Sequence, residues 1–277
     1  MSFTKHNRGF TLIEILVAMT LGIILTMVML AMFSSAKSSY TLQDGLTRVQ
    51  EDGRIAMHVV AEEARKAGFR KPVWNDPRAG YSPLTTGSVN GADGANDTLQ
   101  VMYMDDLDCA GNRNGAFDPE TTEALALYKR VTFAVDDNQN LLWTCEYGPS
   151  PAELAVQRAN QPIVDGVESF QVLYGVDTDF PPDFSINAWT TADSITPNSS
   201  VCMQSQYLCE VGGLINDMRD GLPVALKIGM LIASPENVGG ESDTQSFDIL
   251  DVAVAAADDN RLRKAYSTTV ALRNLTL

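Results

Sequence analysis

Residues 8–18 read RGFTLIEILVA, and they open an apolar stretch that continues to Phe33. Between Phe10 and Phe33 the one ionisable residue is Glu14. As a helix this stretch would measure about 36 Å, which exceeds the roughly 30 Å hydrocarbon core of a bilayer. We therefore predict a membrane-spanning helix over residues 10–33 that carries an acid near its start.

The residues before this stretch include two cations, Lys5 and Arg8. Cations favour the cytoplasmic side, so the chain beyond Phe33 is expected outside the inner membrane, as a single-pass protein. Two alternatives are a secretory signal cleaved after Ala36 and a plain membrane anchor. The apolar stretch is longer than the usual 7–15 residues of a signal. A plain anchor would bear the cost of Glu14, about 2.5–3.5 kcal/mol, without using it.

Beyond the apolar stretch, residues 34–67 are predicted to continue the same helix as an amphipathic segment. Arg65 and Lys66 fall in the expected last turn, and Gly68 stands where a left-handed cap would end the helix. The alternative is two helices with a break near Ser34 and Ser35. The expected apolar stripe follows a 3.6-residue period and consists of Leu42, Leu46, Val49, Ala56, Val60, Ala64 and Ala67.

The rest of the chain, residues 68–277, is predicted to be one β-rich globular domain. Residues 71–97 are rich in Pro, Gly, Asn and Asp, which indicates a surface loop. DDNQN at 136–140 is typical of a hairpin turn, and residues 177–221 are interpreted as an excursion from the sheet. Strand-like segments with β-branched and aromatic residues lie at 98–104, 124–135, 140–147, 167–176, 223–233 and 266–274.

The predicted fold class is therefore α+β, with a long N-terminal helix packed on an antiparallel sheet. Unpaired strands do not remain exposed, and the apolar stripe of the helix also needs a partner. Laying the sheet on that stripe satisfies both requirements.

Composition and motifs argue against several function classes. The chain of 277 residues has a net charge of -15, and its Lys and Arg residues are scattered, so direct nucleic-acid binding is not expected. Beyond residue 8 the one histidine is His58, and no GxSxG, HExxH, P-loop or GxGxxG spacing occurs. The sequence predicts neither an enzyme nor a cofactor.

Four cysteines lie in the part predicted to be exported. An even number in an oxidising compartment favours two disulfides, for which three connectivities exist. We predict Cys109–Cys145, which would tie the end of one strand to another, and Cys202–Cys209, which would close a small loop. No CxxC pair occurs, so a structural zinc site is not expected.

One acidic segment offers oxygen ligands at short spacing. Within DDLDCAGNRNGAFDPE at 105–120, Asp108, Asn112, Asn114 and Asp118 have the ligand chemistry that calcium prefers. The segment departs from the EF-hand pattern because it lacks the regular alternation and the final Glu. We favour a tethered turn that uses Asn and Asp for their backbone tolerance, and so predict no metal.

The first motif resembles the processing site of type IV pilins and pseudopilins. The resemblance implies a leader peptide of residues 1–9 and cleavage between Gly9 and Phe10. Lys5 and Arg8 match the basic leader of that motif, and Glu14 matches the carboxylate used in assembly.

Three further segments resemble the PilW-type minor pilins. They are RKAGF at the helix end, PIVDGVESFQVLYGVD at 162–177 and YSTTVALRN at 266–274. Major pilins usually carry a Pro in the membrane half of the helix, and this sequence has none there.

What the resemblance implies is a pilin-like fold and a scaffold rather than a catalyst. Such proteins are inserted in the inner membrane, cut by prepilin peptidase and methylated on the new N-terminal Phe. An inner-membrane platform assembles them with other minor pilins and the major pilin. Their complex primes the pilus and stands at its tip, on the cell surface, where the fibre supports twitching motility, adhesion and DNA uptake.

Two alternative functions remain open from the sequence. One is a pseudopilin of the type II secretion system, which shares the N-terminal motif. The other is a membrane-anchored adhesin or ligand-binding module at the pilus tip, which would use the loops at 71–97 and 177–221.

Overall fold

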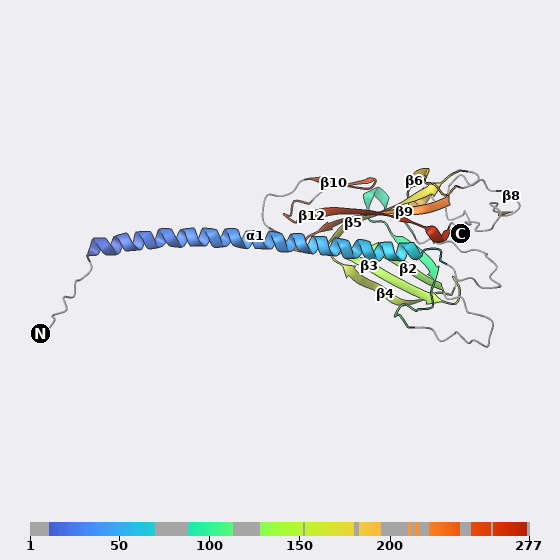
Figure 1. Ribbon diagram of the computed structural model, residues 1–277, viewed down its shortest axis with the longest axis horizontal. Coiled ribbons are helices and arrows are strands. Elements are labelled where there is room, and N and C mark those ends of the chain that lie inside the picture. The colour runs from blue at the N-terminus through green and yellow to red at the C-terminus, as the bar shows by residue number, and fades with distance from the viewer. Residues whose placement is uncertain are drawn as a thin grey trace.

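The protein consists of one long helix whose second half lies among β-strands, while its first half stands apart from them (Figure 1). This arrangement is taken from a computed structural model. The residues that it describes are 11–69, 88–112, 128–151, 153–179, 183–194, 210–211, 214–215, 222–238, 245–255 and 257–275.

Helix α1 spans Leu12–Lys66, 55 residues or about 82 Å. Thr11 caps its first turn, because the Thr11 side chain accepts a hydrogen bond from the backbone N–H of Glu14. The helix runs unbroken through Ser34 and Ser35, so the alternative of two helices is wrong.

The end of α1 is fixed by its cap and by a distant side chain. Gly68 has φ 77°, the left-handed conformation predicted for this position. The side-chain amide of Asn274 donates to the carbonyl oxygens of Arg65 at 3.0 Å and Ala67 at 3.2 Å. These bonds satisfy carbonyls that the helix leaves without a partner and hold the C-terminal segment against it.

The second half of the helix packs against two four-stranded antiparallel sheets. The sequence had predicted a single sheet there. The first has the order β1-β2-β3-β4 and the second β12-β9-β5-β6. The strands of the first are β1 Leu99–Met104, β2 Tyr128–Val135, β3 Leu141–Gly148 and β4 Ala155–Val164. Those of the second are β5 Val167–Asp177, β6 Ala188–Thr190, β9 Leu222–Ala233 and β12 Arg263–Ala271.

The remaining elements are small. Strands β7 and β8 form one two-stranded ribbon, and β10 and β11 form another. Three single turns of 3-10 helix complete the described chain. The bounds are η1 Ala92–Gly94, η2 Ala192–Ser194, β7 Glu210–Val211, β8 Leu214–Ile215, β10 Ser246–Ile249, β11 Val252–Ala255 and η3 Arg273–Leu275.

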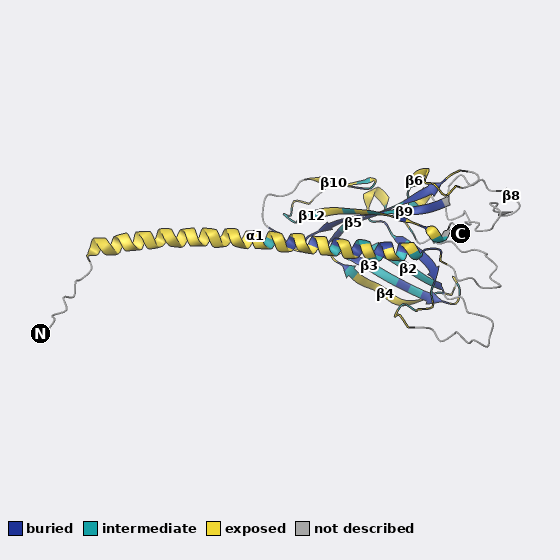
Figure 2. Cartoon of the chain, in the orientation of Figure 1, coloured by how far each residue is buried: buried dark blue, intermediate teal, exposed yellow. Residues whose placement is uncertain are grey.

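Figure 2 shows that one face of the second half of α1 is buried against the sheets. Most of the residues on that face are small. Leu42 and Leu46, which were predicted to lie in the buried stripe, are each 44% exposed. Glycines take part in the contact instead, because only a residue without a β-carbon lets the helix approach so closely. The buried residues of the helix are Gly45, Val49, Gly53, Ala56, Val60, Ala61 and Ala64.

The predicted hairpin turn at 136–140 lies between β2 and β3. The Asp136 carboxylate accepts hydrogen bonds from the backbone N–H groups of Asn138 and Asn140, and Gln139 adopts φ 64°. These bonds to an Asp side chain are the reason that such residues favour turns.

The described end of the predicted surface loop at 71–97 is anchored to the second sheet. The Asp97 carboxylate is 4% exposed and accepts from the backbone N–H groups of Gly91 and Val172, each at 2.7 Å. Burial raises the pKa of this carboxyl, whereas the two hydrogen bonds act in the opposite direction. The segment from 88 to 97 therefore belongs to the packed domain.

Candidate functional site: the exposed apolar half of the helix

The first half of α1 exposes its apolar side chains on every side (Figure 2). From Leu12 to Phe33 each residue is exposed, and the most apolar window of the helix has a mean hydropathy of 2.6. By length and composition this helix is able to cross a membrane. A soluble monomer would not present so much apolar surface to water, so this half is built to be covered by lipid or by other helices.

Two threonines in this half are satisfied within the helix. The Thr20 hydroxyl donates to the carbonyl oxygen of Val17 at 2.9 Å, and that of Thr26 donates to the carbonyl oxygen of Gly22 at 2.6 Å. Each hydroxyl donor is thus already used before the helix meets any partner. Glu14 is the one charged residue of this half.

Glu14 occupies the first turn of α1 and is exposed. A helix N-terminus is the end at which a negative charge is favoured, because unpaired N–H groups leave partial positive charge there. Among the described residues, no side chain donates a hydrogen bond or forms an ion pair with the Glu14 carboxylate. An acid in this place suits a cation brought by another molecule or by the chain's own N-terminus.

The predicted processing residues Lys5, Arg8, Gly9 and Phe10 lie outside the described residues. The same holds for Asn114 and Asp118 of the acidic segment and for Cys202 and Cys209. These assignments, including the second disulfide, stay predictions.

The predicted disulfide Cys109–Cys145 is present, with Cα atoms 5.9 Å apart. Cys145 is fully buried within β3, whereas Cys109 lies in the turn that follows β1. The bond ties this turn to the first sheet.

The described part of the acidic segment is a tethered turn. The Asp108 carboxylate accepts from the backbone N–H groups of Ala110 and Asn112, both at 2.8 Å. The hydrogen bonds from Asn112 are the first reason that the pKa of Asp108 lies below its ordinary value. Asp108 thus stabilises the described part of this turn, and the absence of a metal stays a prediction.

A second group of carboxylates was not predicted. Asp177, Asp179 and Asp183 place one oxygen each within 4.8 Å of one another at the end of β5. Each carboxylate accepts from an N–H donor: Asp177 from Asp179 and Phe184, Asp179 from the Asn187 amide, and Asp183 from Ser185. Each of the three carboxylates is thus already hydrogen-bonded to a residue of the same segment.

His58 lies on the exposed surface of α1, with its Nε2 3.6 Å from a carboxylate oxygen of Glu62. The two residues are one helical turn apart, and both side chains are more than half exposed. Such a pair is a surface contact of small energy and does not resemble a catalytic arrangement.

Comparison with known proteins agrees with this geometry. The profile of the family described as Type IV Pilus-assembly protein W matches residues 132–274, just over half of the chain. The prokaryotic N-terminal methylation motif matches residues 4–31, which include Glu14 and most of the apolar half.

Two proteins of Thermus thermophilus are similar to the chain. The pilin-like protein PilA3 is 30% identical over 103 residues, which are 36% of this chain and 43% of that protein. A solved type IV-like pilin shares 18% identity with a TM-score of 0.48, over 82% of this chain and 97% of the other. The chain carries a methylation motif on an exposed apolar helix and a PilW profile over its sheets, and it therefore belongs to the PilW family of type IV pilus-assembly proteins.

Proposed function

We propose that this minor pilin joins other minor pilins in the inner-membrane complex that primes assembly of the type IV pilus, and that it remains at the tip of the fibre. In this proposal residues 1–9 are a cytoplasmic leader, α1 is anchored in the membrane, and residues 68–277 lie in the periplasm. Prepilin peptidase removes the leader, and the assembly platform extracts the mature chain. The fibre then supports twitching motility, adhesion or DNA uptake.

The observation that carries the proposal is the single carboxylate on an otherwise apolar and fully exposed half-helix. Glu14 costs about 2.5–3.5 kcal/mol in a bilayer, so a helix that served only as an anchor would be better without it. Cleavage before Phe10 would create an α-amine at the same end of the helix. In an assembly, Glu14 of one subunit can pair with that amine of the next, which neutralises two charges in a low-dielectric setting.

Such a pair also sets the axial register of neighbouring helices. Apolar helices slide past one another with little change in contact energy, because lipid tails are as apolar as the side chains. One ion pair removes that freedom. The match to a pilus-assembly family supports a pilus rather than a secretion pseudopilus.

The test compares Glu14→Ala with Glu51→Ala in the bacterium that makes the protein. Glu51 is also an exposed acid of α1, but it lies beyond the apolar half. We expect Glu14→Ala to enter the membrane and to be cleaved normally, yet to show reduced crosslinking to other minor pilins and fewer surface pili. Glu51→Ala should behave like the wild type. Normal crosslinking and normal piliation of the Glu14 variant would exclude Glu14 as an assembly residue.

A further inference from the structure

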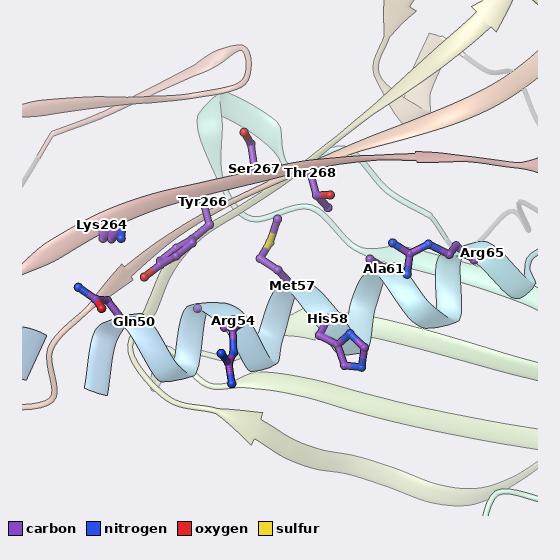
Figure 3. A pocket seen from close by; sticks show the side chains of 11 residues that line it. Gln50, Arg54, Met57, His58, Ala61, Arg65, Lys264, Tyr266, Ser267 and Thr268 are labelled. Carbon is purple, nitrogen blue, oxygen red and sulfur yellow. The ribbon is translucent and has the colours of Figure 1, made fainter. Parts of the chain in front are cut away.

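A groove of about 530 Å³ lies between the second half of α1 and strand β12 (Figure 3). Its helix side carries Arg54, His58 and Arg65, and its strand side carries Lys264 and Tyr266. The Tyr266 hydroxyl donates to the carbonyl oxygen of Val49 at 3.0 Å, which fixes the strand to the helix along one border.

Strand β12 is the end strand of the second sheet. In the described part of the chain it pairs with β9 alone, in a continuous antiparallel register from Arg263 to Ala271. Every second residue of an end strand directs its backbone N–H and C=O away from the sheet. The border of the groove is therefore a row of backbone groups on which another strand can form hydrogen bonds.

The groove is positively charged in a chain that is strongly negative. The described residues that line it include Arg54, Arg65 and Lys264 and no Asp or Glu, although the whole chain has a net charge of -15. Arg54 and Arg65 are exposed and make no ion pair with any residue that the structure describes. Lys264 lies over the ring of Tyr266, 5.2 Å from its centroid. The positive charge of the groove favours a ligand with acidic groups.

The dimensions suit a short extended peptide. Arg54 and Arg65 are separated by about 16 Å along the helix, which equals about five residues of a β-strand. A strand added to β12 would turn alternate side chains toward the helix, where Ala61 and the half-buried Met57 line the groove between the two arginines.

We propose that this groove binds an extended acidic segment of a neighbouring pilin subunit, which adds to β12 as a fifth strand. Its backbone pairs with the open edge, and its alternate Asp or Glu side chains meet Arg54 and Arg65. The identity of the partner as a pilin rests on the proposed function, whereas the chemistry of the groove does not. A polyanion such as a nucleic acid has the right charge but makes no use of a strand edge, so we favour the peptide.

The test uses the full chain in detergent micelles and a fluorescein-labelled octapeptide in which Asp alternates with Val or Thr. Fluorescence anisotropy should show saturable binding. A peptide with Lys in place of each Asp should not bind. A third peptide keeps every Asp but is N-methylated at each interior amide, so it retains the charge and cannot pair as a strand; its affinity should fall at least tenfold.

The protein variant is Arg54→Glu combined with Arg65→Glu, and the matched control is Arg158→Glu. Arg158 is exposed on β4, away from the groove. We expect the double variant to raise the Kd at least tenfold and the control to change it less than twofold. An unchanged melting temperature in all variants would show that the fold is retained.

Two results would overturn the inference. Equal affinity for the N-methylated peptide, or for inorganic polyphosphate of the same charge, would show a site that reads charge alone. Unchanged binding by the double variant would place the peptide elsewhere. Because these assays use isolated protein, they stand whether or not Glu14 proves to be an assembly residue.

Discussion

The aromatic ring of Tyr266 lies directly against the backbone of Gly53, so that a β-carbon at residue 53 would come within 2.3 Å of the ring. The contact joins the middle of the helix to the last strand of the second sheet. It also explains why a glycine is retained inside a long helix, where it costs about 1 kcal/mol relative to alanine.

This contact predicts that Gly53→Ala changes the free energy of unfolding in opposite directions, depending on whether Tyr266 is present. Gly53→Ala should destabilise the protein by about 1–3 kcal/mol, because the methyl group displaces the ring and breaks its bond to the Val49 carbonyl. In a Tyr266→Ala background the same substitution should instead stabilise by up to about 1 kcal/mol through helix propensity. Urea unfolding of the four proteins measures both effects. An equal loss in the two backgrounds would contradict the contact.

The disulfide should contribute most of its stability through the unfolded chain. Cys109 and Cys145 enclose a separation of 36 residues, for which the chain-entropy relation gives about 4 kcal/mol. Replacing both with Ser should lower the free energy of unfolding by about 3–4 kcal/mol, and dithiothreitol should lower that of the wild type but not of the variant. A wild type that is insensitive to reduction would rule out this role.

The buried guanidinium of Arg263 should be essential to the second sheet. Its side chain is 0% exposed and bonds to Glu168 at 2.7 and 2.9 Å and to Asp259 at 2.8 Å. Arg263→Met would remove the hydrogen bonds to both carboxylates and leave Glu168 with Arg261, 3.5 Å away, as its remaining cation. The substitution should therefore cost about 3 kcal/mol, the lower end of the range for breaking a buried ion pair. Arg158→Met, on the exposed face of β4, should cost little. Chemical unfolding at pH 7 gives the comparison.

The same network predicts a pH dependence. The hydrogen bonds from Arg263 hold the pKa of Asp259 below its ordinary value of 3.8. A carboxyl with a lowered pKa in the folded state stabilises the protein above its unfolded pKa and loses that contribution as the pH falls through the folded value. The stability difference between wild type and Arg263→Met should therefore narrow below about pH 3.8. A difference that grows in acid would refute this assignment.

The mature chain should begin at Phe10 and carry one added methyl group. Cleavage there leaves the apolar half of α1 intact as an anchor. Mass spectrometry of protein recovered from membranes and from sheared pili gives the N-terminus directly, and Gly9→Leu should leave the leader attached. A chain that starts at Lys37 would indicate a secretory signal instead.

The helix and most long strands could be predicted because they carry strong local patterns. β1, β3, β5 and β9 agree with the predicted segments within one residue at each end. β12 begins at Arg263, three residues before the predicted 266, and ends at Ala271, because Arg273–Leu275 forms a 3-10 turn.

Strand β4, the helix interface and the groove could not be predicted, because they depend on tertiary contacts that the periodicity of apolar residues in the sequence does not show. β4, Ala155–Val164, is exposed along most of its length and contains Pro162, so it lacks the apolar alternation that marks a strand. A search for an apolar stripe selects leucines and passes over glycines. For this reason the sequence predicted Leu42 and Leu46 at the interface, where the structure has Gly45 and Gly53. The groove beside β12 could not be predicted because its arginines come from the helix and its edge from the last strand.

The contact between Gly53 and Tyr266 fixes the rotation of α1 about its own axis, and it therefore also fixes the direction in which Glu14 points at the other end of the helix. Because α1 is continuous from Leu12 to Lys66, Glu14 lies about eleven turns before Gly53, and the two residues point in directions that differ by about a sixth of a turn. Gly53 lines the groove beside β12. Because one continuous helix carries both residues, the direction in which Glu14 points is fixed relative to the groove. A subunit that packs along this side of the helix would contact both Glu14 and the groove.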